Sequence, residues 1–179
     1  KDVNSYSGLT IKEISPVMKL NLRGKSRDFL STIGKNINMI LPLEANTSSS
    51  SDKYTSMWLS PDEWMVVSNN TLDRENNHYE IEELLFNKIS KNNLGAITDV
   101  SDQFVLINIS GEKIFELLSR GCPFNFNDFS KKKGAVTQTI LAQIDIIIHH
   151  KELNNIDLFV RRSFSEHLMS WIDDAASRL

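Results

Sequence analysis

The chain has 179 residues, of which 20 are Lys or Arg and 23 are Asp or Glu, giving a net charge of -3. A chain of this length can bury a full core without disulfides or structural metal, so we expect a single domain over residues 1–179. The basic residues are scattered, which argues against nucleic acid as a partner. The single cysteine, Cys122, excludes an internal disulfide framework and a cysteine-rich zinc site.

No apolar run reaches the roughly 20 residues that span a bilayer. The first ten residues are polar and lack the apolar stretch of a signal peptide. We therefore expect a cytoplasmic protein with no membrane partner.

In the first half, apolar and polar side chains alternate between residues 17 and 23, which predicts a half-buried strand. Gly24 follows, and apolar residues at helical spacing predict a helix over about residues 25–33. Residues 45–53 contain four consecutive serines and too little apolar content to pack. We expect a mobile polar loop there.

Two short strands are predicted at residues 54–59 and 63–68, joined by a tight turn that Pro61 favours by presetting its φ angle. Residues 79–89 carry acidic residues early and apolar residues at helical spacing. This pattern predicts a second amphipathic helix.

The second half repeats this order. Residues 20–30 and 107–117 share one pattern, with Gly24 and Gly111 where a strand turns into a helix. Self-similarity of this kind indicates a repeated structural unit.

Beyond this corner, residues 138–148 alternate and are predicted to form one strand, followed by another at residues 156–160. A capping box from Ser163 to Glu166 predicts the start of the closing helix. Two repeated halves result, residues 11–94 and 97–179.

Each half reads as a strand-helix-strand-strand-helix unit. Antiparallel hairpins with amphipathic helices on one face predict an α+β two-layer sandwich with pseudo-twofold symmetry.

Catalytic signatures such as a glycine-rich phosphate loop or a nucleophile elbow do not occur in the sequence. His149 and His150 are neighbours on a predicted strand and point to opposite faces, so they do not ligate one metal. Cys122 is better explained as a structural thiol than as a nucleophile, and Asp99 as a turn residue than as a ligand-binding carboxylate. We predict no catalytic, cofactor-binding or metal-binding residue in the chain.

A partner interface is predicted from two features. Trp58 and Trp64 flank the turn and share a face of the hairpin, where they either belong to the core, the better explanation, or anchor a partner. Arg162 continues an apolar strand register and needs a carboxylate, either internal or from a partner chain. The predicted interface residues are Pro61, Asp62, Trp64, Arg161 and Arg162.

Five segments form an ordered set, residues 58–64 (WLSPDEW), 97–103 (ITDVSDQ), 118–123 (LSRGCP), 138–142 (QTILA) and 159–164 (FVRRSF). In this order and spacing they resemble the gamma subunit of heterotetrameric sarcosine oxidase. Together they extend over roughly residues 55 to 176, and their order makes the resemblance more specific than any one of them.

The resemblance implies a fold similar to the folate-binding domains of the aminomethyltransferase of the glycine cleavage system. It also implies membership of an oxidoreductase complex, acting on CH-NH donors in sarcosine catabolism and one-carbon metabolism. This complex oxidatively demethylates sarcosine and passes the one-carbon unit to tetrahydrofolate. Its implied cofactors are FAD, FMN, NAD and tetrahydrofolate, with the flavins and the dinucleotide held by the large subunits. The implied partners are the alpha, beta and delta subunits, and the gamma chain is a non-catalytic scaffold.

One alternative is a stand-alone folate-binding aminomethyltransferase-like protein. It would need a carboxylate to bind the pterin and a third domain for which 179 residues leave no room. A folate-fold domain acting in RNA modification is a weaker alternative, because the sequence has neither a basic surface nor a fused catalytic domain.

Overall fold

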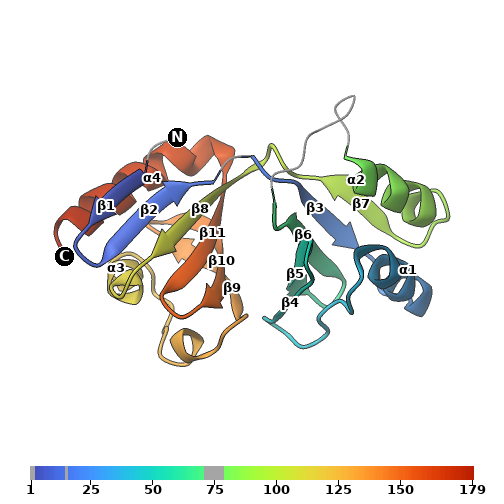
Figure 1. Ribbon diagram of the computed structural model, residues 1–179, viewed down its shortest axis with the longest axis horizontal. Helices are drawn as coiled ribbons and strands as arrows, with labels where there is room; N and C mark the ends of the chain where they lie inside the picture. Colours follow the sequence, from blue (N-terminus) through green and yellow to red (C-terminus); the bar gives the residue numbers. More distant parts are fainter. Residues whose placement is uncertain (1–2, 15, 71–78) are drawn as a thin grey trace. The chain divides into compact units, whose positions relative to one another are not determined.

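A computed structural model describes residues 3–14, 16–70 and 79–179. The chain divides into two compact units, which Figure 1 shows coloured along the sequence. Unit 1 combines Lys1–Ser15 with Gln103–Leu179, and unit 2 comprises Pro16–Asp102. These boundaries differ from the predicted halves, because the N-terminal strands pair with the sheet of the second half.

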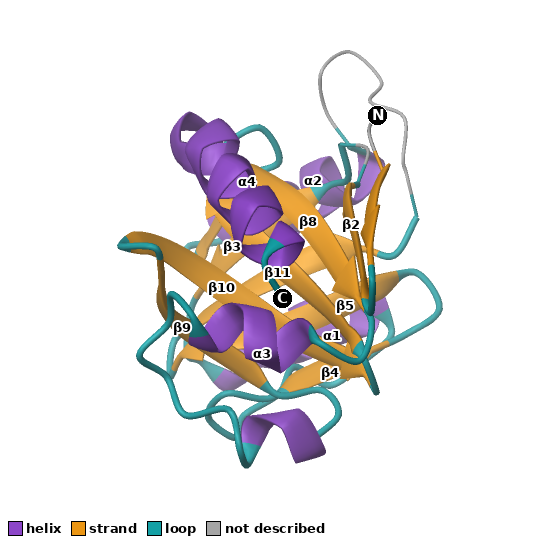
Figure 2. Cartoon of the chain, turned by 90° about the vertical axis from the view of Figure 1, so that its left-hand side faces the viewer, coloured by secondary structure: helices purple, strands orange, loops and turns teal. Residues whose placement is uncertain are grey.

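Unit 1 contains a six-stranded sheet in the order β1-β2-β8-β11-β10-β9, in which every pair is antiparallel. Its strands are β1 (Val3–Tyr6), β2 (Leu9–Glu13), β8 (Phe104–Ser110), β9 (Val136–Leu141), β10 (Ile144–Glu152) and β11 (Asn155–Arg161). Its helices are α3 (Ile114–Ser119), the short 3-10 helix η2 (Phe129–Lys131) and α4 (Arg162–Ser177). In Figure 2, α3 and α4 lie over the same face of this sheet.

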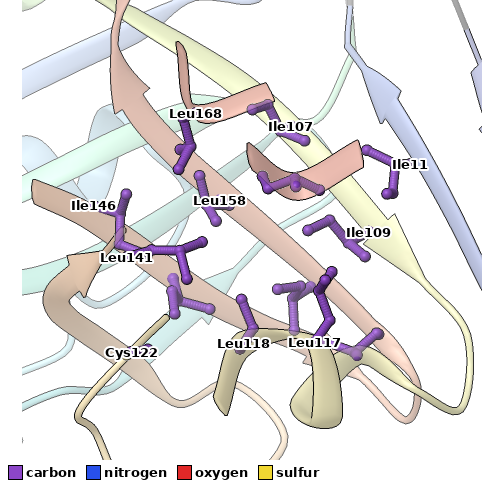
Figure 3. Packing of buried hydrophobic residues seen from close by; sticks show 14 of the residues in the cluster. Ile11, Ile107, Ile109, Leu117, Leu118, Cys122, Leu141, Ile146, Leu158 and Leu168 are labelled. Carbon is purple, nitrogen blue, oxygen red and sulfur yellow. The ribbon is translucent and has the colours of Figure 1, made fainter. Parts of the chain in front are cut away.

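The core of unit 1 forms between that face and the helices. Ile107, Ile109 and Leu158 point from the strands toward Leu117 of α3 and Leu168 of α4, and all five are at most 1% exposed (Figure 3). Alternation along each strand places such side chains on one face. Burying each of them contributes about 1.5–3 kcal/mol.

Unit 2 contains a five-stranded antiparallel sheet in the order β4-β5-β6-β3-β7. Its strands are β3 (Lys19–Arg23), β4 (Ser48–Ser50), β5 (Tyr54–Ser60), β6 (Glu63–Ser68) and β7 (Ala96–Asp99). Its helices are α1 (Arg27–Ile37), α2 (Glu80–Leu85) and a π-helical turn, η1 (Phe86–Ser90). The core forms where the apolar stripe of α1 packs against the sheet, and the ring centroids of Phe29 and Trp64 lie 6.1 Å apart there.

The ends of α1 follow the usual capping rules. The Phe29 N–H donates to the Ser26 side chain at 3.1 Å, which caps the N-terminus. Asn38 takes a left-handed conformation with φ of 54°, and its N–H donates to the Gly34 carbonyl.

The strand-to-helix corners use glycine for a physical reason. At Gly24, a Cβ would lie 2.5 Å from the Phe29 ring, and at Gly111 it would lie 2.0 Å from the Gly8 carbonyl oxygen. Gly111 also has a φ of 129°, a backbone conformation that residues other than glycine rarely adopt. Both corners therefore exclude larger residues.

The β5–β6 hairpin is confirmed, with Trp58 and Trp64 as cross-strand partners. Residues 45–53 were predicted to form a mobile loop, but they contain β4, which pairs with β5. Residues 138–148 do not form one strand. They turn at Ala142 and Gln143, which have φ angles of 51° and 67°, and so divide into β9 and β10.

The start of the last helix also differs from the prediction. Helix α4 begins at Arg162, and no side chain caps its N-terminus. The Ser165 hydroxyl donates instead to the Arg162 carbonyl at 2.9 Å, so the predicted capping box does not form. Within the described residues, none of the helices has the length and apolar character needed to cross a bilayer.

Candidate partner-binding surface

The residues predicted to bind a partner fall into two groups, one in each unit. Pro61 and Asp62 are exposed at the β5–β6 turn of unit 2. The Asp62 carbonyl accepts the Gly24 N–H at 3.0 Å, and its carboxylate accepts the Ser60 hydroxyl at 2.8 Å. The turn is therefore a fixed, exposed feature.

Trp64 does not belong to this surface, which corrects the prediction. It is 1% exposed, and its Nε1–H donates to the Pro42 carbonyl at 2.7 Å. The half-buried Trp58 packs against the same core. The explanation of both tryptophans as core residues is the one that the structure supports.

Arg161 and Arg162 are both exposed at the junction of β11 and α4. The Arg161 guanidinium lies 5.5 Å from the centroid of the Phe104 ring, a cation–π contact. Arg162 does not continue the strand register, because it is the first residue of α4 and its N–H donates to the Gln103 carbonyl at 2.8 Å. Because Arg162 is exposed, its guanidinium group pays no desolvation cost that a carboxylate partner would have to offset.

A hollow of about 460 Å³ lies beside Arg161, on strands β8 to β11. Its lining comprises Phe104, Gln138, Thr139, Ile140, Asp145, Ile146, Ile147 and Arg161. The lining combines a cation, a carboxylate and apolar side chains, so it can receive a group that is itself amphipathic.

The two adjacent histidines of β10 have different surroundings. The His150 ring stacks on Phe129 and meets Phe115 edge-on, with 5.7 Å between centroids in each case. Because a carbonyl only accepts, the 2.9 Å contact with the Lys132 oxygen fixes the proton on Nδ1. Its Nε2 is buried and has no hydrogen-bond partner in the described part of the chain.

His149 is 6% exposed and has Asp157 as its cross-strand partner. Burial, together with the charges of Lys151 and His150, lowers its pKa to about 4. Asp157 binds Lys151 at 3.4 Å and accepts the Asn108 amide at 2.8 Å. His149 is therefore neutral at physiological pH.

One buried charge was missed in the sequence. Lys19 is 2% exposed, and its ammonium group donates to the carbonyls of Val17 and Ser101, each at 3.3 Å. Its position in an alternating strand resembled that of a solvent-facing residue, so no sequence signal separated it from an ordinary surface lysine. Asp99 accepts the Ser101 N–H at 2.9 Å, which confirms its role in a turn.

Cys122 is 8% exposed in the core of unit 1, with its Sγ atom 3.6 Å from the Thr139 hydroxyl. This environment agrees with a structural thiol. Within residues 3–14, 16–70 and 79–179, no group of three or more His, Cys, Asp or Glu side chains is arranged to hold a metal ion.

The model of one protein family, the sarcosine oxidase gamma subunit family, matches residues 23–178. The chain belongs to this family. The matched region begins well before residue 55, so it includes the part of the first half that resembled the family only in pattern. None of the curated proteins matches the sequence.

The fold is similar to that of a chain in the heterotetrameric sarcosine oxidase from Corynebacterium sp. U-96, solved in complex with pyrrole 2-carboxylate. The TM-score is 0.83 at 19% identity, over 98% of this chain and 87% of that one. Aspartate kinase from Clostridium acetobutylicum gives a TM-score of 0.46 at 13% identity, over 100% of this chain and 37% of that one. The TATA-binding protein (TBP) of Methanococcus jannaschii gives 0.36 at 10% identity, over 94% and 98%.

Proposed function

We propose that this chain is the non-catalytic, structural gamma subunit of a heterotetrameric sarcosine oxidase. The complex oxidatively demethylates sarcosine and transfers the one-carbon unit to tetrahydrofolate. The family match over residues 23–178 carries this proposal. The partners would be the alpha, beta and delta subunits, of which the large ones would hold FAD, FMN and NAD. The complex would work in the cytoplasm, where the lone thiol of Cys122 stays reduced.

The structural comparison supports a role as a separate subunit. Of the matched chain in the Corynebacterium sp. U-96 oxidase, 87% is covered, so the similarity extends over most of one chain of an assembly. A small chain that resembles most of one chain of such an assembly is suited to packing against larger neighbours.

The finer description of the fold, a pseudo-symmetric pair of folate-binding-domain-like layers, is also part of this proposal. It is supported by the order of elements, which is β3-α1-β4-β5-β6-α2 in one unit and β8-α3-β9-β10-β11-α4 in the other. The matching sheet orders, β4-β5-β6-β3 and β9-β10-β11-β8, support it as well. A repeated unit that has no catalytic role persists as a packing scaffold.

The test is to express the tagged chain in its native host, purify it gently, and record the copurifying polypeptides and the visible spectrum. We expect larger chains and a flavin band, whereas the chain produced alone is colourless and does not bind tetrahydrofolate. A chain that returns alone and colourless but binds tetrahydrofolate tightly would support the stand-alone aminomethyltransferase-like protein instead.

The remaining predicted interface residues, Pro61, Asp62, Arg161 and Arg162, are part of the same proposal. Reversing the charge with Arg162→Glu should weaken recovery of the other subunits. Arg178→Glu, an exposed residue near the C-terminus of the same helix, is the matched control. Equal recovery with both variants would remove Arg162 from the interface.

A further inference from the structure

Helix α1 has three distinct faces. Its core face carries Phe29, Ile33 and Ile37, which are at most 1% exposed. On one flank, Asn36 accepts the Lys88 ammonium of η1 at 3.4 Å. The residues on the other flank recur at intervals of three and four along the helix, as residues on one helical face do. They border a groove of about 500 Å³.

This α1 groove is largely apolar and lies between α1 and the chain that follows it. Its lining residues are Arg27, Leu30, Ser31, Gly34, Lys35, Asn38, Met39, Ile40, Leu41 and Leu43. Ile40 is 84% exposed and Leu43 is 65% exposed. Large apolar side chains that gather on a surface in this way mark an interaction site.

The segment that carries Ile40 and Leu43 is anchored on both sides of Ile40 and directly before Leu43. The Ser56 hydroxyl donates to the Met39 sulfur at 3.0 Å, Leu41 is 2% exposed, and the Pro42 carbonyl accepts the Trp64 indole N–H at 2.7 Å. Ile40 and Leu43 therefore project from a backbone that the core holds in place. A preorganised apolar surface loses little conformational entropy when a partner binds.

Gly34 brings the segment close to the helix. The N–H groups of Asn38 and Met39 both donate to its carbonyl, and a Cβ on Gly34 would lie 2.6 Å from the Met39 carbonyl oxygen. Only glycine permits this close return of the chain, which forms one end of the groove.

The charged residues that line the groove are both basic. Arg27 and Lys35, both exposed, are its charged lining residues, and they stand eight residues apart on α1. At 1.5 Å per residue this separation is about 12 Å along the helix. Asp28 and Glu44, the neighbouring acids in the sequence, do not line the groove. An occupant with carboxylates near both ends and apolar side chains between them would complement this surface.

We infer that the α1 groove is a docking site for an apolar, carboxylate-bearing segment of another subunit of the oxidase. The inference rests on the proposed function, because it takes the occupant from the same assembly. Ile40 and Leu43 supply the apolar anchors, and Arg27 and Lys35 fix the register of the segment by pairing with its acids.

Two double variants test the groove, Ile40→Ser with Leu43→Ser and Arg27→Glu with Lys35→Glu. Their matched controls in unit 1 are Leu153→Ser, which is 81% exposed, and the exposed Lys133→Glu. Each tagged full-length chain is expressed in the native host, and the copurifying subunits are quantified. Circular dichroism and the melting temperature check that each variant is folded.

Each groove variant should lower recovery of the other subunits at least about tenfold, because central anchors dominate binding energy. The controls should match the wild type. If the wild type and the groove variants recover the subunits equally, the groove inference fails and the proposed function stands. If the wild type recovers no subunit, the proposed function itself fails. A wild-type chain that dimerises alone, and is made monomeric by Ile40→Ser with Leu43→Ser, would show a second copy as occupant and overturn the inference.

Discussion

The loops that follow the first helix of each unit treat their apolar residues in opposite ways. After α3 in unit 1, Phe126 and Phe129 are buried and contact each other and Phe115, with centroids between 5.4 and 6.2 Å apart. After α1 in unit 2, Ile40 and Leu43 face outward from an anchored backbone. The loop after the first helix thus completes the core in unit 1, whereas the equivalent loop in unit 2 forms an exposed apolar surface.

The units also secure their sheets differently. Unit 1 closes with the 16-residue α4, whereas unit 2 has the six-residue α2 followed by a π-helical turn. The β1 edge of unit 1 is fastened to α4 through Asp173, which accepts hydrogen bonds from Asn4 and Tyr6. Unit 1 therefore fastens its edge strand to its long closing helix, whereas unit 2 leaves Ile40 and Leu43 exposed after its first helix.

The largest change in stability is expected from a cavity in the core beneath the α1 groove. Phe29→Ala should lower the free energy of unfolding by about 3–5 kcal/mol, because a fully buried ring is replaced by a cavity. Hydrogen exchange measured by mass spectrometry should accelerate first in unit 2. An equal acceleration in unit 1 would show that the units unfold together.

A pH titration tests the closure of unit 1. The folded pKa of His149 is about 4 and its ordinary value is 6.5, so the unfolded state binds the proton more readily. Stability from the neutral ring is full above pH 6.5 and is lost as the pH falls to 4, by up to about 3 kcal/mol. Denaturant unfolding across this range measures the slope.

His149→Gln should flatten that slope, whereas His167→Gln, at an exposed position of α4, should leave it unchanged. The same slope in wild type and His149→Gln would assign the acid sensitivity to another group.

Removing the Asp173 carboxylate should separate β1 from α4. Asp173→Ala deletes acceptors used by Asn4 and Tyr6, and hydrogen bonds to a charged group contribute about 1.5–3 kcal/mol each at most. We expect faster hydrogen exchange in β1 and a lower pKa for Tyr6 than in the wild type, because desolvation and Asp173 together raise it and only the part due to Asp173 is lost. Asp174→Ala, whose ion pair with Arg178 is exposed, is the control and should change neither measurement.

The smallest effect is expected at the anchor of the α1 groove. Trp64→Phe keeps most of the buried ring but leaves the Pro42 carbonyl without its donor, at a cost of about 1–3 kcal/mol. Proteolysis should then cut the segment around Ile40 and Leu43 faster. The half-buried Trp58→Phe serves as control, and cleavage at equal rates in both variants would contradict the anchoring role of Trp64.

The elements that could be predicted from the sequence are those with strong local signals. The hairpin at Pro61 and the corners at Gly24 and Gly111 combine turn chemistry with clear periodicity. The turn at Ala142 and Gln143 was missed because neither residue is typical at positive φ. Strand β4 was missed because a run of serines has no alternation of apolar and polar residues.

Interface residues were harder to predict than elements. A pattern of alternation shows that Trp64 lies on one face of a strand, but it does not show which face is covered. The α1 groove depends on how residues 38–43 return over the helix, and this return is set by the tertiary contacts of Met39 and Trp64. Short-range sequence patterns do not specify such tertiary contacts.

The division of the chain between the units has a consequence for synthesis on the ribosome. Strand β2 is translated before unit 2, but its partner β8 begins only at Phe104, after all of unit 2 has been translated. Unit 2 is continuous in sequence and can complete its sheet while β1 and β2 have only each other as partners. Strands β1 and β2 are therefore translated before unit 2 but join their sheet after it, and a nascent chain stalled near Asp102 would carry one finished unit and a β1–β2 pair without its β8 partner.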